Sequence, residues 1–549
     1  MVWLISSQPI PSHAAESVIA DSDIAAVVKK ISSASFHPYL TRQDITKHQV
    51  AIEKLYGLSK FQFIWLNTFN TSDPAEKALR LLASASERGL SVQDYDGESL
   101  RWQWYRIVAG QITALNDLAL FDLALSVGVL RYLSDLHFGR VKPWQVKFRV
   151  NAKAEQPDFA QIISDAVNNR EIEKLDEKFD PAFALYDDLK RALSNYRNIA
   201  QQHSGINFKF EKSLTLGSID PQVIYLRRLL TALGDYLQQQ EDNAILIDEN
   251  IYEGAIVAAV KRFQLRHGLE VDGIIGKKTI AALNTPISFR IHQIELALER
   301  LRWLPVLQEG PLIAVNIPSF QLWAFDPPDG QKYEPLNMKV VVGKAFDWQT
   351  PIFKADMHYL YFRPYWNVPK SIVRKEILPK IQQNALYLAS QNMELVNRFG
   401  NNATLVEFNQ ESIGLLTSGA LHVRQRPGPR NALGRVKFIF PNRYDVYMHD
   451  TPAQSLFKHS RRDFSHGCIR VEKPEALAEF ALKRQEGWDR EEIQKAMARK
   501  TKRVKIKTPI PLIIFYSTAI VNQGVVSFLD DIYGLDKILS RALLKKGQN

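Results

Sequence analysis

The sequence contains a single cysteine, Cys468, and its neighbours are of the types that turn a thiol into a nucleophile. It lies in the run Ser465-His466-Gly467-Cys468-Ile469-Arg470, and His449 precedes it by 19 residues. A thiol attacks a carbonyl group as its thiolate, and a nearby imidazole can take the proton or, once charged, stabilise the sulfur anion. His449 and His466 are therefore the two candidate imidazoles.

Two further residues of this run favour acyl-transfer chemistry. Gly467 allows the backbone to turn tightly, so that amide N–H groups around Cys468 can converge on a developing oxyanion. If the run is a strand, Arg470 lies on the same face as Cys468 and can supply positive charge. A lone cysteine is more often a small buried apolar residue, and these neighbours favour the chemical role over that alternative.

The run around Cys468 resembles the signature of the L,D-transpeptidase catalytic domain, a family of cysteine enzymes that cross-link peptidoglycan. Further segments resemble the large periplasmic branch of that family. They are Val342-Gly343-Lys344 with Thr350-Pro351, the segment Tyr365 to Ile372, and the segment Arg424 to Gly434. Because these segments are far apart in the sequence, they support the resemblance independently.

The resemblance implies a role for each matching position around the thiol. Cys468 is expected to be the nucleophile and His449 the general base. His466 is expected to support the thiol, although a structural hydrogen bond is an equal alternative, since its position can hold serine in the large branch. The backbone N–H groups of Gly467 and Cys468 are the expected oxyanion donors, and Tyr447 resembles the tyrosine near the oxyanion site.

More distant positions are expected to hold the substrate. Arg470 matches the arginine that follows the cysteine in the family, and its role is electrostatic. Trp366 and Asn367 are expected to line the substrate cleft, although Trp366 could instead belong to the core. Arg424 is a candidate contact for acidic groups of the wall peptide, and a solvated basic loop is the alternative. His267, His358 and His422 lack partners at metal-ligand spacing, so no metal site is expected.

The implied reaction is an acyl transfer in two halves. Cys468 attacks the carbonyl between meso-diaminopimelate and the terminal D-alanine of a tetrapeptide stem, which releases D-alanine and leaves a thioester. The side-chain amine of a second stem then attacks the thioester and forms a 3→3 cross-link. Interception by water or a free D-amino acid gives carboxypeptidase or exchange activity instead. The resemblance implies no metal or organic cofactor, and it implies acylation of the thiol by carbapenems.

Two other function classes stay open from the sequence. One is a wall-binding scaffold whose catalytic domain is silent, against which the retained Cys468, His449 and Arg470 argue. The other is a cysteine peptidase that hydrolyses wall peptides. Nucleic-acid binding is disfavoured because the basic residues are dispersed and no nucleic-acid module is evident.

The elements that position these residues are predicted to form a multidomain α+β protein. Residues 21–216 are predicted to be a helical scaffold domain, because apolar residues recur at helical spacing, as in Leu118 to Leu133. Residues 217–286 resemble a three-helix peptidoglycan-binding domain, on the pairs Phe263-Gln264, Gly268-Leu269 and Asp272-Gly273 together with the step from Gly276 to Thr279.

The C-terminal part is predicted to be mostly β. Residues 287–309 are expected to be a linking helix, and residues 310–549 the catalytic domain, because short β-rich runs such as Leu312 to Ile317 alternate with turn residues. A helical, polar stretch at about 371–417 is expected to be an inserted subdomain over one face.

Length and composition agree with several globular domains. At roughly 100 to 200 residues per domain, a chain of 549 residues suits three or four domains. Apolar residues make up 46% and charged residues 23%, which excludes a largely disordered chain. The net charge of +11 favours polyanions without identifying one. A single cysteine excludes an internal disulfide and zinc ribbons.

The N-terminal residues 1–20 are expected to be the remnant of a truncated secretory signal. Ser12-His13-Ala14, followed by Ala15-Glu16, resembles a small-x-small cleavage site after a short apolar start. A plain disordered N-terminus is the alternative. The longest internal apolar run, Pro509 to Val521, is shorter than the roughly 18 to 20 residues of a spanning helix, so no transmembrane segment is expected. The expected location is the periplasm or cell envelope, with peptidoglycan stem peptides as partner.

Overall fold

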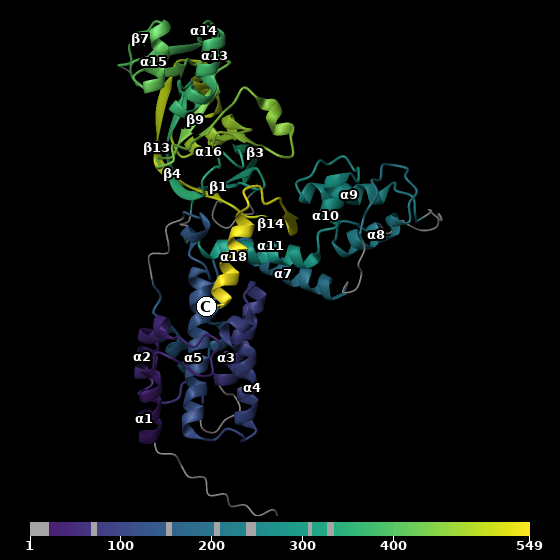
Figure 1. The fold of residues 1–549 in the computed structure, drawn as a ribbon, viewed down its shortest axis with the longest axis vertical. Helices are drawn as coiled ribbons and strands as arrows, with labels where there is room; N and C mark the ends of the chain where they lie inside the picture. Colours follow the sequence, from purple (N-terminus) through teal and green to yellow (C-terminus); the bar gives the residue numbers. More distant parts are fainter. Residues whose placement is uncertain are drawn as a thin grey trace, which may run out of the picture. The chain divides into compact units, whose positions relative to one another are not determined.

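The computed structural model describes residues 21–66, 74–149, 156–202, 209–237, 249–305, 310–326, 334–400 and 402–548. The expected signal remnant lies outside these residues. The chain divides into two compact units, and Figure 1 draws their helices and strands. The first unit comprises the chain up to Phe138 together with Glu155–Asp180, and the second comprises Gly139–Ala154 and Pro181–Gln548.

The first unit is helical and has its own apolar core. Its longest helix, α5, spans Leu115–Phe138 and is buried on almost all sides, as expected of a central helix. Shorter helices pack around it: α1 (Asp21–Ser32), α2 (Gln49–Leu58), α3 (Pro74–Ala83), α4 (Gly97–Val108) and α6 (Phe159–Asn168). The helical N-terminal fold predicted from periodicity is therefore confirmed.

The second unit begins with a pair of helices that support the β-domain. Helix α7 (Ala184–Gln202), which we expected in the helical domain, packs instead on α11 (Ile287–Arg302). Helix α11 was expected only to link domains, yet most of its residues are buried and several belong to the core of the β-domain. Arg302 on this helix is fully buried and is paired with Glu299 at 2.8 Å.

The three-helix module of the second unit consists of α8 (Gln222–Ala232), α9 (Ala255–Arg266) and α10 (Lys277–Leu283). The stripe expected on α9 is buried in the core of the module, including Ile256 and Phe263. Gln264 accepts the Gly273 N–H at 2.8 Å and donates to Asp272 at 2.9 Å. The glycine-containing turn is therefore fastened to α9.

A buried arginine ties this module to the rest of the second unit. Arg266 binds both carboxylate oxygens of Asp235, at 2.8 and 2.5 Å, and donates to the Tyr196 hydroxyl at 3.2 Å and to the Val526 carbonyl at 3.4 Å. Tyr196 belongs to α7, and Val526 to the hairpin of β14 (Ala519–Asn522) and β15 (Val525–Phe528). One side chain thus joins three elements.

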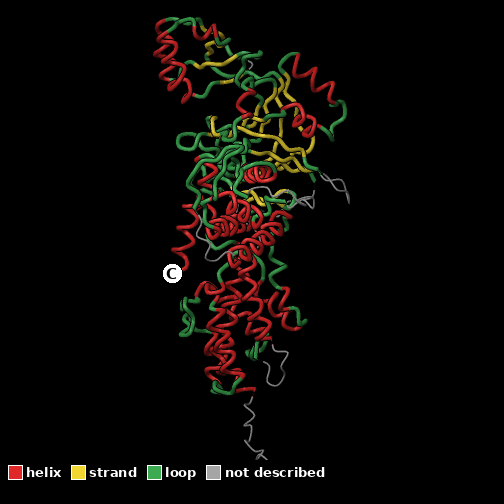
Figure 2. Tube along the Cα trace, turned by 90° about the vertical axis from the view of Figure 1, so that its right-hand side faces the viewer, coloured by secondary structure: helices red, strands yellow, loops and turns green. Residues whose placement is uncertain are grey.

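The β-domain contains a nine-stranded mixed sheet in the order β11-β3-β12-β10-β9-β4-β13-β1-β2, and an additional β2–β3 pairing closes it on itself. Its strands are shown in yellow in Figure 2. They are β1 (Leu312–Asn316), β2 (Gln321–Phe325), β3 (Leu336–Gly343), β4 (Phe353–Phe362), β9 (Val436–Ile439), β10 (Met448–His449), β11 (Asp463–Ser465), β12 (Ile469–Val471) and β13 (Lys502–Phe515).

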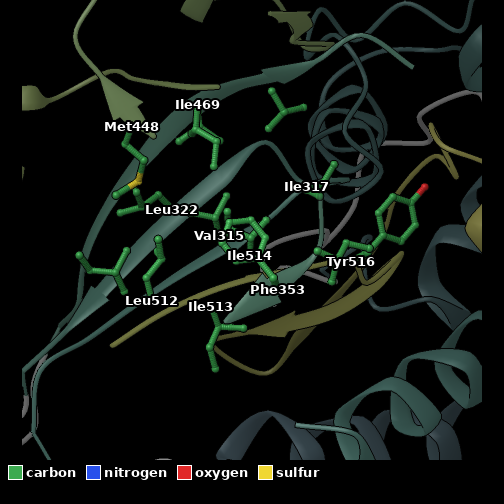
Figure 3. Close-up of a cluster of buried hydrophobic side chains, with 14 of the residues drawn as sticks. Val315, Ile317, Leu322, Phe353, Met448, Ile469, Leu512, Ile513, Ile514 and Tyr516 are labelled. Carbon is green, nitrogen blue, oxygen red and sulfur yellow. The ribbon is translucent and has the colours of Figure 1, made fainter. Parts of the chain in front are cut away.

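Apolar side chains of this sheet form the main core, part of which is labelled in Figure 3. Met448 and Ile469, from neighbouring strands, are both fully buried there. Helices α16 (Pro474–Leu482), α17 (Arg490–Ala498) and α18 (Leu535–Gln548) complete the domain. The predicted fold class, a mostly β domain after a helical N-terminal region, is confirmed.

Residues from Val368 to Val423 form a subdomain with its own core. It contains a small sheet in the order β5-β8-β6-β7. Its strands are β5 (Trp366–Asn367), β6 (Met393–Val396), β7 (Leu405–Val406) and β8 (His422–Gln425), and its helices are α12 (Lys370–Ile372), α13 (Leu378–Gln383), α14 (Tyr387–Ser390) and α15 (Gln410–Ser418). A π-helical stretch, Val373–Ile377, separates α12 from α13.

Replacing Arg266 tests whether this residue holds the three-helix module to the rest of the second unit. Arg266→Met removes a cation whose carboxylate partner Asp235 is only 4% exposed, and breaking a buried pair in this way costs about 3–5 kcal/mol. We expect a lower midpoint for the thermal transition to which the module contributes. The control Arg228→Met changes an exposed arginine on α8 and should leave the midpoint in place. Equal midpoints for the two variants would contradict this account.

Candidate active site

Strand pairing brings the predicted nucleophile and base onto one face of the sheet. β10 and β12 are parallel neighbours, with Met448 opposite Ile469 and His449 opposite Arg470. One residue before Met448 and Ile469, Tyr447 lies beside Cys468. The Ile469 N–H donates to the Tyr447 carbonyl at 3.0 Å. Because side chains alternate along a strand and Met448 and Ile469 point into the core, Tyr447, His449, Cys468 and Arg470 share the opposite face. His449 and Cys468 are diagonal neighbours on it.

The Cys468 sulfur lies against Tyr447 and Asp445. The S–H group faces the Asp445 carbonyl at 3.9 Å. Burial raises the pKa of the Cys468 thiol above its ordinary value of 9.0, while hydrogen bonds from the backbone and hydroxyl of Tyr447 and the charges of Lys437 and Arg470 act in the opposite direction. Burial has the larger effect, so the resting group is a thiol that gives up its proton during attack.

The imidazole of His449 is buried, 5% exposed, and held in a fixed orientation. Its Nδ1 lies 2.5 Å from the backbone carbonyl of Asp450, so Nδ1 carries the hydrogen and Nε2 is left as the base. Burial, followed by the positive charge of Arg470, lowers the pKa of His449 to about 3, and Lys437 contributes in the same direction. The ring is therefore neutral at physiological pH and able to accept a proton.

The residue that orients His449 could not be identified from the sequence, and the structure shows how it is fixed. The Asp450 carboxylate accepts the N–H groups of Arg435 at 2.8 Å and Thr451 at 2.7 Å. Gly434, just before Arg435, has φ +60°, and a β-carbon there would lie 2.4 Å from the Asp450 side chain. This close approach needs glycine, and it locks the peptide whose carbonyl faces the imidazole.

Lys437 is a site residue that the motif comparison missed. It pairs with His449 across β9 and β10, on the side opposite Arg470. Its Nζ lies 3.6 Å from the centre of the Tyr447 ring. Burial lowers the pKa of Lys437 to about 8, and the adjacent Cys468 opposes that effect. The sequence did carry a sign of this role, because Lys437 interrupts the apolar run Val436 to Ile439.

The predicted cation Arg470 lies on the same face as the thiol. Burial lowers the pKa of its guanidinium, and Cys468 opposes that change. Its Nε is buried and has no hydrogen-bond partner within the described ranges of the chain. The side chain is thus a partly buried cation whose Nε is left as a donor for an anionic group.

The turn before the nucleophile is built by Ser465 and Gly467. Ser465 Oγ accepts the Gly467 N–H at 3.1 Å and donates to the Cys468 carbonyl at 2.5 Å. Gly467 has φ +110°, a conformation that favours glycine. The Gly467 amide, expected as an oxyanion donor, is thus engaged inside the turn. Glycine is required at position 467 because the backbone there adopts a positive φ.

A buried network holds the other side of this turn. The Thr350 hydroxyl donates to the Gly467 carbonyl at 2.8 Å and accepts the Gly343 N–H at 2.9 Å. The Tyr533 hydroxyl in turn accepts the Thr350 N–H and donates to the Gly343 carbonyl at 2.6 Å. The segments Val342 to Lys344 and Thr350-Pro351, which carried part of the resemblance, therefore buttress the nucleophile turn.

His466 contacts the insertion. Its Nε2 lies 2.5 Å from a carboxylate oxygen of Glu376, and its ring packs edge-on against Trp348 at 5.1 Å. Of the two roles left open for this histidine, the geometry favours the structural hydrogen bond.

The three expected substrate contacts lie on the small sheet of the insertion. Trp366 pairs with Gln425 and Asn367 with Arg424 across β5 and β8. Burial raises the pKa of Tyr447 well above its usual value, and the Trp366 side chain acts in the opposite direction. Arg424 forms an ion pair with Glu394 at 2.5 Å, so its charge is already compensated.

In the parts of the chain that the structure describes, no group of three or more His, Cys, Asp or Glu side chains is arranged to hold a metal ion. Among the described helices, none combines the length and apolar character needed to cross a bilayer.

The protonation states of the site can be tested by alkylation. Because the pKa of Cys468 is raised and His449 is neutral, we expect iodoacetamide to react slowly at pH 5–7 and faster as the pH rises past 9.0. Lys437→Met removes a cation and should move the profile to higher pH, whereas the exposed control Lys458→Met should not. Fast alkylation with a plateau at pH 5–7 would instead indicate a preformed thiolate–imidazolium pair.

The buried hydroxyl beneath the nucleophile turn gives a second test. Thr350 is 2% exposed, and Thr350→Val leaves the Gly343 N–H and the Gly467 carbonyl without this partner, at about 1–3 kcal/mol for each unsatisfied group. We expect a lower free energy of unfolding by chemical denaturation. Thr350→Ser keeps the hydroxyl and should remain close to the wild type. A valine variant as stable as the serine variant would refute the role of this hydroxyl.

Comparison with known families assigns three parts of the chain. Residues 310–506 match the L,D-transpeptidase catalytic domain. Residues 220–283 match a family described as "Putative peptidoglycan binding domain", and residues 50–193 match a family described as "Scaffold domain". The resemblances inferred from the sequence are therefore confirmed for all three regions.

One curated protein agrees with the catalytic match. A Haemophilus influenzae protein named "Putative L,D-transpeptidase" is 32% identical over 252 residues, which are 46% of this chain and 49% of that protein. The chain thus spans about half the length of this relative. A crystal structure of L,D-transpeptidase (Yku) from Stackebrandtia nassauensis matches 55% of this chain and 94% of its own at 15% identity, with a TM-score of 0.21 that is too low to support an argument. Residues 310–506, which carry the cysteine site, belong to the L,D-transpeptidase catalytic domain family, in a chain that also has a scaffold domain and a peptidoglycan-binding domain.

Proposed function

We propose that this chain is a peptidoglycan L,D-transpeptidase that forms 3→3 cross-links through a thioester on Cys468. The observation that carries the proposal is the shared face of β10 and β12, on which a thiol, a phenol and a neutral imidazole lie together. The match to the catalytic family supplies the reaction class. Because the chain spans about half of its curated relative, the activity of that protein is not transferred as a whole.

In the first half-reaction, the Cys468 sulfur bonds to the carbonyl carbon between meso-diaminopimelate and D-alanine. His449 takes the thiol proton on Nε2 as the sulfur attacks, since Nδ1 is engaged by the Asp450 carbonyl. The carbon–nitrogen bond then breaks, and the proton passes from His449 to the departing amine of D-alanine. A thioester remains on the enzyme.

The oxyanion of this step needs donors near the sulfur. Tyr447 lies beside Cys468, and burial raises the pKa of its phenol, so the hydroxyl stays protonated. We assign the oxyanion site to this hydroxyl and the Cys468 N–H, because the Gly467 N–H is engaged by Ser465. Arg470, with a free buried Nε within the described structure, is available to an anionic group of the stem peptide.

In the second half-reaction, the side-chain amine of another stem attacks the thioester. His449 accepts a proton from the neutral amine as it attacks. The carbon–sulfur bond then breaks, and His449 returns the proton to the departing sulfur, which restores the thiol. Water or a free D-amino acid in place of the amine gives the carboxypeptidase and exchange reactions. Carbapenems would acylate the same sulfur.

The other domains suggest where the reaction takes place. The peptidoglycan-binding domain supports peptidoglycan as the partner. We therefore propose a periplasmic or cell-envelope location with a role in wall biogenesis and cell shape. A location outside the cytoplasm also suits a chain with one cysteine, because no second thiol is present to form an internal disulfide.

Muropeptide analysis tests the proposed function. Sacculi are digested from cells that lack related enzymes and express the wild type, Cys468→Ala, His449→Ala or the matched control His459→Ala, whose histidine is exposed. We expect 3→3 dimers with the wild type and the control, none with Cys468→Ala, and a yield lowered by about 10²- to 10⁴-fold with His449→Ala, the usual contribution of a general base. Wild-type dimer levels with Cys468→Ala would overturn the proposal.

A further inference from the structure

Two consecutive residues of the insertion contact two adjacent rings of the catalytic domain. Glu376 Oε1 lies 2.5 Å from Nε2 of His466. Lys375 places its Nζ 4.9 Å from the centre of the Trp348 ring. The Trp348 and His466 rings pack edge to face at 5.1 Å. The four side chains therefore form one continuous seam between the insertion and the nucleophile turn.

The insertion presents these residues from an unusual backbone. Val373–Ile377 is a π-helical stretch between α12 and α13. Val373 and Ile377 are buried in the core of the insertion, whereas Lys375 and Glu376 lie between them and face the catalytic domain. Single π-turns inside helices occur often at functional sites, because they re-aim side chains that an α-helix would direct elsewhere.

The nucleophile turn is thus held from two sides by contacts of different kinds. On one side, Thr350 holds the Gly467 carbonyl in a buried network that also includes Tyr533. On the other side, Glu376 holds His466 in a contact whose side chains are 43% and 24% exposed. The first contact is enclosed by the domain core, and the second can open to solvent if the insertion lifts.

We propose that Glu376 is a positioning residue, which acts through His466 to couple the seating of the insertion to the backbone geometry of Gly467 and Cys468. The proposal rests on the proposed function, in which Cys468 is the nucleophile. His466 is bonded directly to Gly467, so a shift of its ring is transmitted to the turn that carries the sulfur. The small sheet of the insertion also carries Trp366, which pairs with Gln425 across β5 and β8.

This coupling is reciprocal. If the seated insertion stabilises the acylated form of Cys468, then at equilibrium an occupied sulfur favours the seated insertion by the same factor. Acylation of Cys468 should therefore slow hydrogen exchange in the Val373–Ile377 segment, which does not contain the modified residue. Because a partly exposed ion pair adds little to global stability, the melting temperature should change little when the contact is removed.

The experiment measures acylation by meropenem with intact mass, together with hydrogen exchange, on the full chain. Glu376→Ala is compared with Glu376→Gln, His466→Ala, the double variant Glu376→Ala/His466→Ala, and the control Glu411→Gln, an exposed glutamate at the start of α15. We expect roughly tenfold slower acylation for Glu376→Ala, since small misplacements of reacting groups have effects of this order or larger. Glu376→Gln, which keeps a hydrogen-bonding group, should lie between the wild type and the alanine variant.

The double variant should be no slower than the slower single variant, because both substitutions break the same contact. Glu376→Ala should also speed exchange in residues 370–383 and 464–470, while Glu411→Gln should match the wild type in every measurement. Acylation and exchange for Glu376→Ala equal to those of Glu411→Gln, or effects that multiply in the double variant, would overturn the proposal. Failure of the wild type to be acylated would count against the proposed function, and the exchange data would then decide the coupling by themselves.

Discussion

The site depends on the parallel pairing of β10 with β12. This pairing sets His449 opposite Arg470 and, two residues before each of them, Tyr447 beside Cys468. A shift of register by one residue would direct one set of these side chains to the core face, because successive side chains of a strand point to opposite sides. The buried pair Met448 and Ile469 opposes such a shift, since it would expose apolar side chains. Packing on one side of the sheet thus fixes the chemistry on the other.

The same burial sets the protonation states of the site. A thiol with a raised pKa and an imidazole with a pKa of about 3 rest as neutral groups, with Lys437 and Arg470 on either side of His449. The cations disfavour an imidazolium before substrate is bound, and they favour negative charge on sulfur or oxygen once attack begins. His449 is suited to act as a base during the reaction. The negative charge that develops on sulfur or oxygen is stabilised by Lys437 and Arg470, which are already in place.

Much of this arrangement was predictable from local sequence. Cys468, His449 and Arg470 stand out by residue type and spacing, and short β-rich runs predicted that the domain around them is mostly β. Other parts depend on contacts between distant segments, which periodicity does not encode. The carbonyl of Asp450 is a backbone group and leaves no side-chain signal, and the Glu376–His466 contact spans 90 residues. Helix α7 looked like part of the helical domain because its amphipathic pattern does not specify which domain covers its apolar face. The domain boundaries and the roles of the site residues stay predictions.

The most direct test of the central claim is a search for the covalent intermediate. The full chain is mixed with a tetrapeptide stem in the absence of an acceptor amine, quenched in acid, and measured by intact mass and peptide mapping. The account predicts an adduct of the stem without its terminal D-alanine, attached to the peptide that contains Cys468 and absent from Cys468→Ala. Release of D-alanine with no adduct on that peptide, or an equal adduct on the alanine variant, would contradict it.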